Sequence, residues 1–213
     1  CTNDIKGLPA GAGCEAFLCN VKGRLLGHVF VFADEESLWI ESVSGQGGAL
    51  TSHLNKYCLV EDVQLVDQTE TLAEFLVSGP QAAQLLTEAG LDVSELEPWR
   101  HVKQSVQAGG VEAEFHIKRV DIFGAPAFLI TSDAAQCDAL WERLTNVGIV
   151  PAGTSVFESL RIEATFPVYG IDLSDENLAQ EAARTERAIS FQKGCYLGQE
   201  PIARLNAMGH VNK

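Results

Sequence analysis

The order of strand-like and helix-like patterns between residues 62 and 148 places the strongest constraint on the fold. Alternating apolar residues and turn residues predict strands over 62–67 and 73–78, a helix over 80–89, strands over 101–107, 111–119 and 125–131, and a helix from Ser132 or Asp133 to Gly148. Gly79-Pro80 marks the start of the first helix, with the proline in its first turn. This order predicts an α+β domain with an antiparallel sheet, because a doubly wound fold would alternate strand and helix.

The residues on either side of this stretch predict a smaller set of elements. Strands are expected over 14–19, 25–33 and 38–43, and helices over 49–58 and 154–164. The polar run Asn20-Val21-Lys22-Gly23-Arg24 joins the first two strands as a hairpin turn. Gly45-Gln46-Gly47-Gly48 lacks the spacing of a dinucleotide-binding loop, so it is interpreted as an ordinary loop, as is 166–180.

Length, composition and charge narrow the class of protein. A chain of 213 residues is long enough for one large domain or two small ones. The net charge of −14 argues against non-specific nucleic-acid binding. Residues 181–213 are the exception, with five Lys/Arg against three acids, which suits a small anionic ligand there. No apolar run is long enough to span a membrane and no signal peptide opens the chain, so no membrane partner is expected. The start at Cys1 rather than methionine suggests a piece of a longer protein.

The cysteines predict reduced thiols and no metal site. They lie at positions 1, 14, 19, 58, 137 and 195. None forms a C-x-x-C pair, and no histidine lies at zinc-finger distance from such a pair. This usage is typical of a cytoplasmic protein.

One short run near the C-terminus combines a thiol, an ammonium, a phenol, an amide and a carboxylate. It is Lys193-Gly194-Cys195-Tyr196-Leu197-Gly198-Gln199-Glu200. It is too polar and too rich in glycine for a core element, so it predicts a tight turn that presents Cys195 to a cleft. Lys193 and a nearby helix N-terminus would lower the pKa of this thiol and favour the thiolate. The alternative is an ordinary loop with an inert cysteine.

This run resembles the K-G-C-Y-x-G-Q-E signature of the YgfZ-type folate-binding proteins. That family is related to the glycine-cleavage T-protein, an aminomethyltransferase, and is implicated in iron–sulfur cluster assembly and repair. Further stretches resemble the same superfamily: 20–24, 160–164, 169–172, 176–178, 180–181 and Gly209-His210-Val211-Asn212. The resemblance runs along the whole chain.

The resemblance implies a T-protein fold of three domains around a central opening. In this layout the first domain is discontinuous, over 1–48 and 155–213, and carries the signature. The inserted α+β domain covers 49–154. The C-terminal β-barrel that follows in the superfamily is expected to be absent from this chain.

The resemblance also implies tetrahydrofolate, or a related folate, as the ligand. Glu163 would hydrogen-bond the pterin, since a carboxylate accepts two N–H bonds from such an edge; a surface salt bridge is the alternative. Tyr169 would pack on the ligand or belong to the core. Arg184 and Arg187 would pair with the carboxylates of the folate or lie on a solvated helix face. The full set of expected ligand-binding residues is Glu163, Arg161, Tyr169, Arg184, Arg187, Tyr196, Gln199 and Glu200.

One departure from the family bears on the chemistry. Aminomethyltransferases carry an aspartate pair just after the first hairpin, and the positions here are Gly27 and His28. The superfamily's transferases also lack the cysteine of the signature. The suspected chemistry therefore moves to Cys195, with Lys193 as its tuning residue and Gln199 and Glu200 ordering the loop.

Three functions remain open from the sequence. The first is a folate-binding accessory factor for iron–sulfur client proteins, such as tRNA-modifying methylthiotransferases, with other cluster ligands supplied by a partner. The second is a folate-dependent aminomethyltransferase or related one-carbon enzyme. The third is a folate-binding module in which Cys195 is inert. The expected location is the cytoplasm, or the mitochondrial matrix if the source is eukaryotic.

Overall fold

The chain divides into two compact units. The computed structural model describes residues 1–209 except Leu59, Glu61 and 109–110. Unit 1 comprises Cys1–Asp67 with Pro167–Lys213, and unit 2 comprises Gln68–Phe166. The sequence predicts an inserted domain over 49–154, which would contain the first helix and exclude the helix that ends at Glu163. In the structure the first helix falls in unit 1, and the helix that ends at Glu163 falls in unit 2. Residues 210–212, which carry part of the family resemblance, lie outside the described residues.

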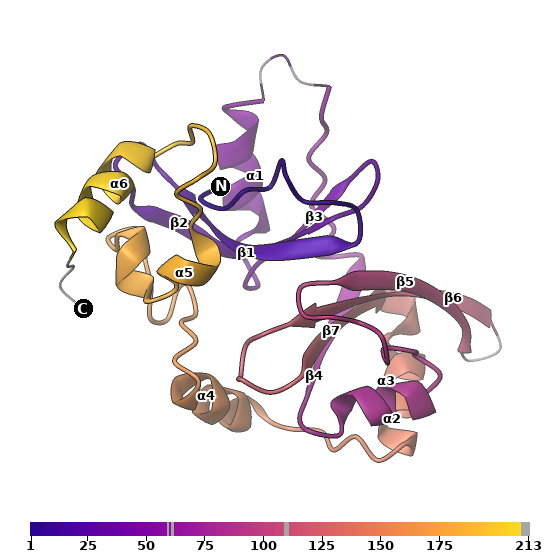
Figure 1. The fold of residues 1–213 in the computed structure, drawn as a ribbon. Helices are drawn as coiled ribbons and strands as arrows, with labels where there is room; N and C mark the ends of the chain where they lie inside the picture. Colours follow the sequence, from indigo (N-terminus) through magenta and orange to yellow (C-terminus); the bar gives the residue numbers. More distant parts are fainter. Residues whose placement is uncertain (59, 61, 109–110, 210–213) are drawn as a thin grey trace. The chain divides into compact units, whose positions relative to one another are not determined.

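The sheet of unit 1 has three antiparallel strands in the order β1 (Ala12–Cys19), β2 (Leu25–Ala33) and β3 (Leu38–Glu41) (Figure 1). The hairpin between β1 and β2 forms as predicted. The Asn20 side chain accepts hydrogen bonds from the Lys22 and Arg24 amides at 2.9 and 3.2 Å, which closes the turn. Helix α1 (Gly47–Asn55) follows and buries Leu50.

Short helices from the second half of the chain complete unit 1. They are η2 (Ala179–Ala182), α5 (Thr185–Ala188) and α6 (Gln199–Met208). Their buried side chains share a cluster with the β1–β2 hairpin: Phe17, Cys19, Leu25, Leu173, Ala179, Ala182, Ala188, Ile189 and Ile202. This packing brings the C-terminal signature onto the sheet formed by the first residues of the chain.

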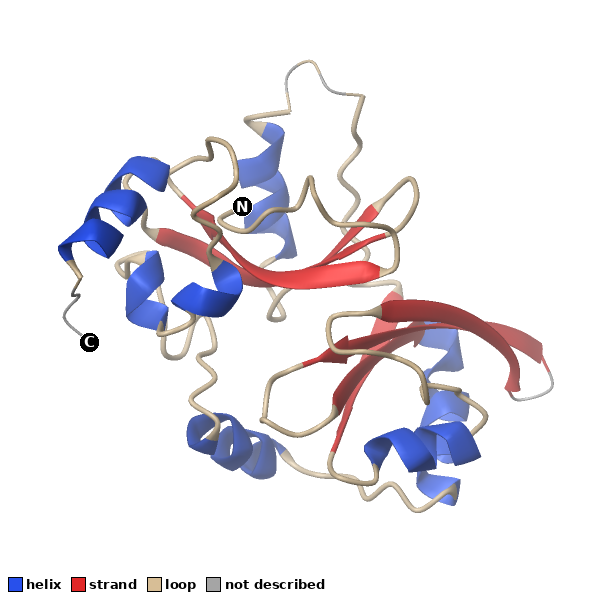
Figure 2. Cartoon of the chain, viewed as in Figure 1, coloured by secondary structure: helices blue, strands red, loops and turns tan. Residues whose placement is uncertain are grey.

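Unit 2 is built on a four-stranded sheet, with the helices at 82–88 and 137–146 on one face (Figure 2). Its elements are β4 (Leu72–Ser78), α2 (Ala82–Glu88), β5 (His101–Ala108), β6 (Val111–Val120), β7 (Ala127–Asp133), the short η1 (Ala134–Gln136), α3 (Cys137–Asn146) and α4 (Thr154–Glu163). The strand order is β4-β7-β6-β5, and every pair is antiparallel. Leu86 of α2 and Leu140 of α3 pack on Phe115, Ile117 and Ile130. The predicted α+β class with antiparallel sheets flanked by helices is confirmed.

Two local predictions are corrected. Residues 62–67 were expected to form a strand but belong to no strand, and Val63 and Val66 are exposed. Their alternation fits a strand, but a strand also needs a neighbour for its backbone groups. The helix after Gly79-Pro80 begins at Ala82, so Pro80 precedes its first turn. Asp133 does act as a cap, because its carboxylate accepts from the Ala135 amide at 2.8 Å.

No helix in the described part of the chain has both the length and the apolar character needed to cross a membrane.

Candidate functional site

Three stretches that carry the family resemblance meet in unit 1. The hairpin turn 20–24 is joined to the stretch 176–178 by hydrogen bonds from the Leu25 amide to the Asn177 carbonyl, at 2.9 Å, and from the Arg24 guanidinium to the Glu176 carbonyl. The same turn contacts the start of α6, where the signature ends. Motifs that lie more than 150 residues apart in the sequence are thus brought together by the packing of unit 1.

Glycine is required where the signature touches the hairpin turn. Gly198 has a φ of +82°, and a Cβ built on it would lie 2.6 Å from the Asn20 carbonyl oxygen and 3.0 Å from the Gly23 Cα. Any larger residue would therefore clash with backbone atoms as well as adopt a strained φ. Of the two glycines in the signature, Gly198 serves this close approach, whereas a Cβ on Gly194 would meet nothing within 4 Å.

Cys195 is exposed on the loop that connects α5 to α6. Two residues before it, the Lys193 ammonium donates to the carbonyl oxygens of Cys1, at 2.9 Å, and Asn3, at 2.6 Å. It also lies 5.2 Å from the centre of the Tyr196 ring. Burial lowers the pKa of Lys193, while the charges of Asp4 and Cys14 oppose that shift. The tuning of Cys195 by Lys193 stays a prediction, and the contacts assign this ammonium a clear role at the backbone.

The other residues of the signature lie at the start of α6 and against the buried cluster of unit 1. Gln199 and Glu200 are its first two residues, and the Glu200 carboxylate lies in the first turn, where a negative charge is favoured by the helix dipole. The Tyr196 ring packs against the buried cluster of unit 1. Burial, and then the nearby Cys19, raise the pKa of Tyr196 to about 12. Among the described residues its hydroxyl, although buried, has no hydrogen-bond partner.

A buried group of charged side chains lies under α5. Glu15 of β1 accepts hydrogen bonds from Arg184 Nε at 2.7 Å and from Arg184 Nη2 at 2.5 Å. His28 of β2 places Nε2 2.7 Å from the same carboxylate and Nδ1 3.2 Å from the Pro167 carbonyl oxygen. Burial alone would raise the pKa of Glu15, but the hydrogen bonds and charges of Arg184 and His28 outweigh it, so this pKa lies below its ordinary value.

This group corrects one expectation and adds a residue that the sequence analysis missed. A solvated helix face was one alternative for Arg184 and Arg187; Arg184 is instead buried against Glu15, whereas Arg187 is exposed. Glu15 was not singled out, although a charged residue within the apolar strand run Ala12–Cys19 was a visible signal. His28 faces Glu15 rather than open solvent, and a Cβ on Gly27 would meet Leu50 at 2.8 Å.

The remaining expected ligand-binding residues fall in both units. Glu163 is exposed at the last position of α4, in unit 2. Arg161 on the same helix is buried and forms an ion pair with Glu158. Tyr169 is in unit 1, where it packs against the buried cluster; burial and the charge of Asp175 raise its pKa. The role of each in ligand binding stays a prediction.

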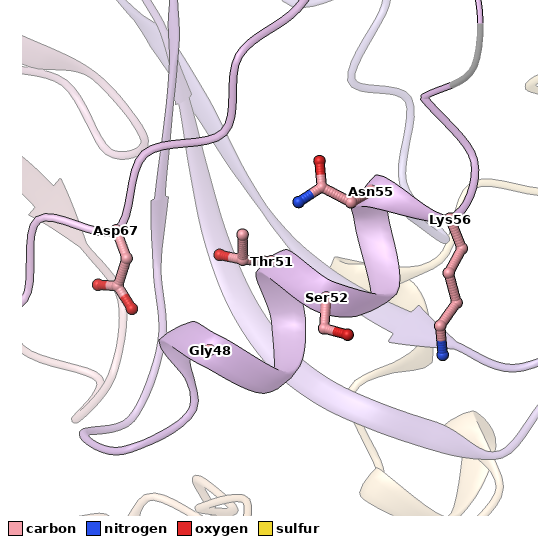
Figure 3. Close-up of a pocket in the computed structure, with 6 residues that line it drawn as sticks. All are labelled: Gly48, Thr51, Ser52, Asn55, Lys56 and Asp67. Atoms are coloured by element: carbon pink, nitrogen blue, oxygen red, sulfur yellow. The ribbon is translucent and has the colours of Figure 1, made fainter.

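A hollow of about 560 Å³ lies along α1 in unit 1. It is lined by Gly48, Thr51, Ser52, Asn55, Lys56 and Asp67 (Figure 3). The Asp67 carboxylate lies at the start of α1, where a Cβ on Gly47 would be 2.2 Å from it. A carboxylate there is favoured by the unpaired amides of the first turn. Within the described part of the chain, none of the ligand-binding residues expected from the sequence lines this hollow.

Comparison with known proteins identifies the family that this fold and these motifs define. Residues 1–193 match the GCVT N-terminal domain, and the chain belongs to that family. It is 27% identical to an aminomethyltransferase of Symbiobacterium thermophilum, with 100% of this chain and 59% of that protein covered. It is 25% identical to an aminomethyltransferase of Alkaliphilus oremlandii, with 100% and 58% covered. The chain therefore spans less than two thirds of these relatives.

A solved structure supports the same fold. The crystal structure of the glycine cleavage system aminomethyltransferase T from Bartonella henselae matches with a TM-score of 0.83 and 23% identity, over 95% of this chain and 55% of that one. The predicted relationship to the T-protein superfamily is confirmed. The assignment to its YgfZ-type branch stays a prediction.

Proposed function

We propose that this chain is the folate-binding part of a protein that acts in folate-linked one-carbon transfer, of the aminomethyltransferase type. The observation that carries the proposal is the family match over residues 1–193, together with relatives that are named aminomethyltransferase. The ligand is tetrahydrofolate or a related folate, and Glu163 is the residue proposed to hydrogen-bond its pterin. The exposed position of Glu163 leaves its carboxylate accessible to a ligand.

A turnover assay tests the transferase activity. The complete protein is incubated with tetrahydrofolate and a methylated amine or an aminomethyl carrier, and one-carbon-loaded folate is measured. Formation of loaded folate that requires the protein supports the proposal. Its absence with every donor, in a protein that still binds folate, would contradict transfer while leaving folate binding intact.

A second candidate is favoured by the residues at the end of the first hairpin. Gly27 and His28 stand where aminomethyltransferases are expected to carry an aspartate pair, and His28 is buried against Glu15. Cys195, by contrast, is exposed. These two observations support an accessory factor that binds folate and uses the Cys195 thiol during assembly or repair of iron–sulfur clusters in client proteins. The comparisons favour the transferase over this candidate.

Complementation tests the second candidate. Cys195→Ala in the complete protein is expected to abolish rescue of iron–sulfur enzymes such as tRNA-modifying methylthiotransferases in cells that lack the protein. Cys137→Ala, which removes a thiol from unit 2, is the matched control and is expected to rescue normally. Full rescue by Cys195→Ala would exclude this role for the thiol.

A further inference from the structure

The loop that presents Cys195 begins at a point held by the N-terminal residues. The Thr2 hydroxyl donates to the Ala188 carbonyl at 2.5 Å and accepts from the Phe17 amide at 2.8 Å, so it joins the end of α5 to β1. The Ser190 amide donates to the Thr2 carbonyl at 3.0 Å. Thr2 is fully buried, which makes these bonds costly to lose.

Two further side chains reinforce this attachment. The Asn3 amide group donates to the carbonyls of Glu15, at 2.8 Å, and Arg187, at 2.9 Å, and therefore bridges β1 and α5. The Lys193 ammonium reaches back to the Cys1 and Asn3 carbonyls from within the loop itself. Hydrogen bonds from an ammonium are stronger than neutral ones, and its half-buried position limits competition from water.

The far end of the loop is held by a different surface. Gly198 packs against the backbone of Asn20 and Gly23, and α6 follows directly. Between the two attachment points lie the exposed residues Gly194 and Cys195. The exposed thiol thus lies in a short span fixed at both ends.

We propose that Thr2 and Lys193 are positioning residues that hold the Cys195 loop on β1, and that Lys193 acts through its bonds to backbone carbonyls rather than through its charge on the thiol. This inference rests on the proposed function, in which the signature loop presents Cys195, and adds the residues that hold that loop in place. Thr2 belongs to no motif of the sequence. Its role in holding the loop is seen only in its hydrogen bonds to Phe17, Ala188 and Ser190.

Hydrogen exchange and thiol alkylation test the proposal together. In the complete protein, Lys193→Met and Thr2→Val are each expected to speed exchange of the 189–197 amides about tenfold, because each removes attachments of this loop. The rate of Cys195 alkylation by iodoacetamide, resolved by mass spectrometry of peptic peptides, is expected to rise about threefold in both variants as the freed loop exposes the sulfur more fully.

Two control variants separate attachment from charge. Lys193→Arg keeps the donors and is expected to restore both rates to those of the unaltered protein. Lys22→Met removes a positive charge from the exposed hairpin turn that contacts Gly198 and is expected to change neither rate. Exchange of the β2 peptides of unit 1 is expected to stay unchanged and reports whether the variants fold.

Either of two results would overturn the proposal. One is unchanged loop exchange in Lys193→Met. The other is slower alkylation in both Lys193→Met and Lys22→Met with no change in Thr2→Val, since that pattern requires an effect of charge. These readouts use no folate, so failure of this proposal and failure of the proposed function remain distinguishable.

Discussion

Each unit contains an ion pair with at least one fully buried side chain, and the two pairs differ in how far the partner side chains are exposed to water. In unit 1 the side chains of Glu15 and Arg184 are 0% and 7% exposed. In unit 2 the Lys118 side chain is 0% exposed, but its partner Glu74 is 34% exposed. Lys118 also donates to the Thr131 hydroxyl at 2.5 Å, and that hydroxyl donates to Glu74 at 2.9 Å.

This difference in exposure determines how strongly the protein is destabilised when one partner of each ion pair is removed. An ion that stays buried without its partner is strongly destabilising, whereas one that reaches water is rehydrated. The Glu15 side chain is fully buried, and Arg184 directly precedes α5, which leads into the Cys195 loop. The pair in unit 1 therefore holds the segment that carries the signature, whereas the pair in unit 2 links strands β6 and β4 through Lys118 and Glu74.

The largest effect is expected from Arg184→Met. Among the described residues, the substitution leaves the buried Glu15 carboxylate with His28 as its remaining side-chain partner, so the free energy of unfolding should fall by about 3–5 kcal/mol. Urea denaturation measures the loss. Arg187→Met, three residues further along in α5, is the control and is expected to change stability by less than about 0.5 kcal/mol because Arg187 is exposed. Equal effects of the two substitutions would show that the buried pair is not what stabilises this segment.

A smaller, pH-dependent effect is expected from Glu15→Gln, since glutamine keeps an acceptor for Arg184. The pKa of Glu15 is lowered in the folded state, so its contribution is present above the unfolded value of about 4.3 and is lost as pH falls through the folded pKa. The stability difference between the unaltered protein and Glu15→Gln should therefore be largest near neutral pH and shrink on acidification. Urea denaturation at several pH values measures it, and a difference independent of pH would contradict this account of Glu15.

The smallest effect is expected from Lys118→Met in unit 2. Methionine fills the apolar volume of the lysine stem, Thr131 still donates to Glu74, and Glu74 can be hydrated, so the expected loss is about 1 kcal/mol. Comparison of urea midpoints with those of Arg184→Met gives the contrast between the units directly. A loss in Lys118→Met as large as that in Arg184→Met would remove the distinction.

The elements that the sequence predicted well are those whose signal is local. Alternation identified β1, β2 and the strands of unit 2, and Asn20 and Gly23 identified the turn. Residues 62–67 have the same alternation but no neighbouring strand, and no local pattern reveals a missing neighbour. Helix α6 was not predicted, because Gly198 and Pro201 look like breakers although they lie at its N-cap and in its first turn.

The candidate site shows the same limit. The signature loop and its exposed cysteine could be predicted from residue chemistry and from the family resemblance. The attachment of Lys193 to the Cys1 and Asn3 carbonyls joins opposite ends of the chain, as does the pairing of Glu15 with Arg184. Such pairings depend on how the hairpin and α5 pack, which spacing in the sequence does not specify.

Folate binding is common to both candidate functions, so a titration of the complete protein tests the central claim most directly. Isothermal calorimetry with tetrahydrofolate, under oxygen-free conditions, is expected to give saturable binding. Glu163→Gln should weaken it at least about tenfold, because it removes a charged acceptor of two hydrogen bonds. Glu186→Gln, an exposed acid in α5, should bind like the unaltered protein. Absence of saturable binding by the unaltered protein would contradict the account.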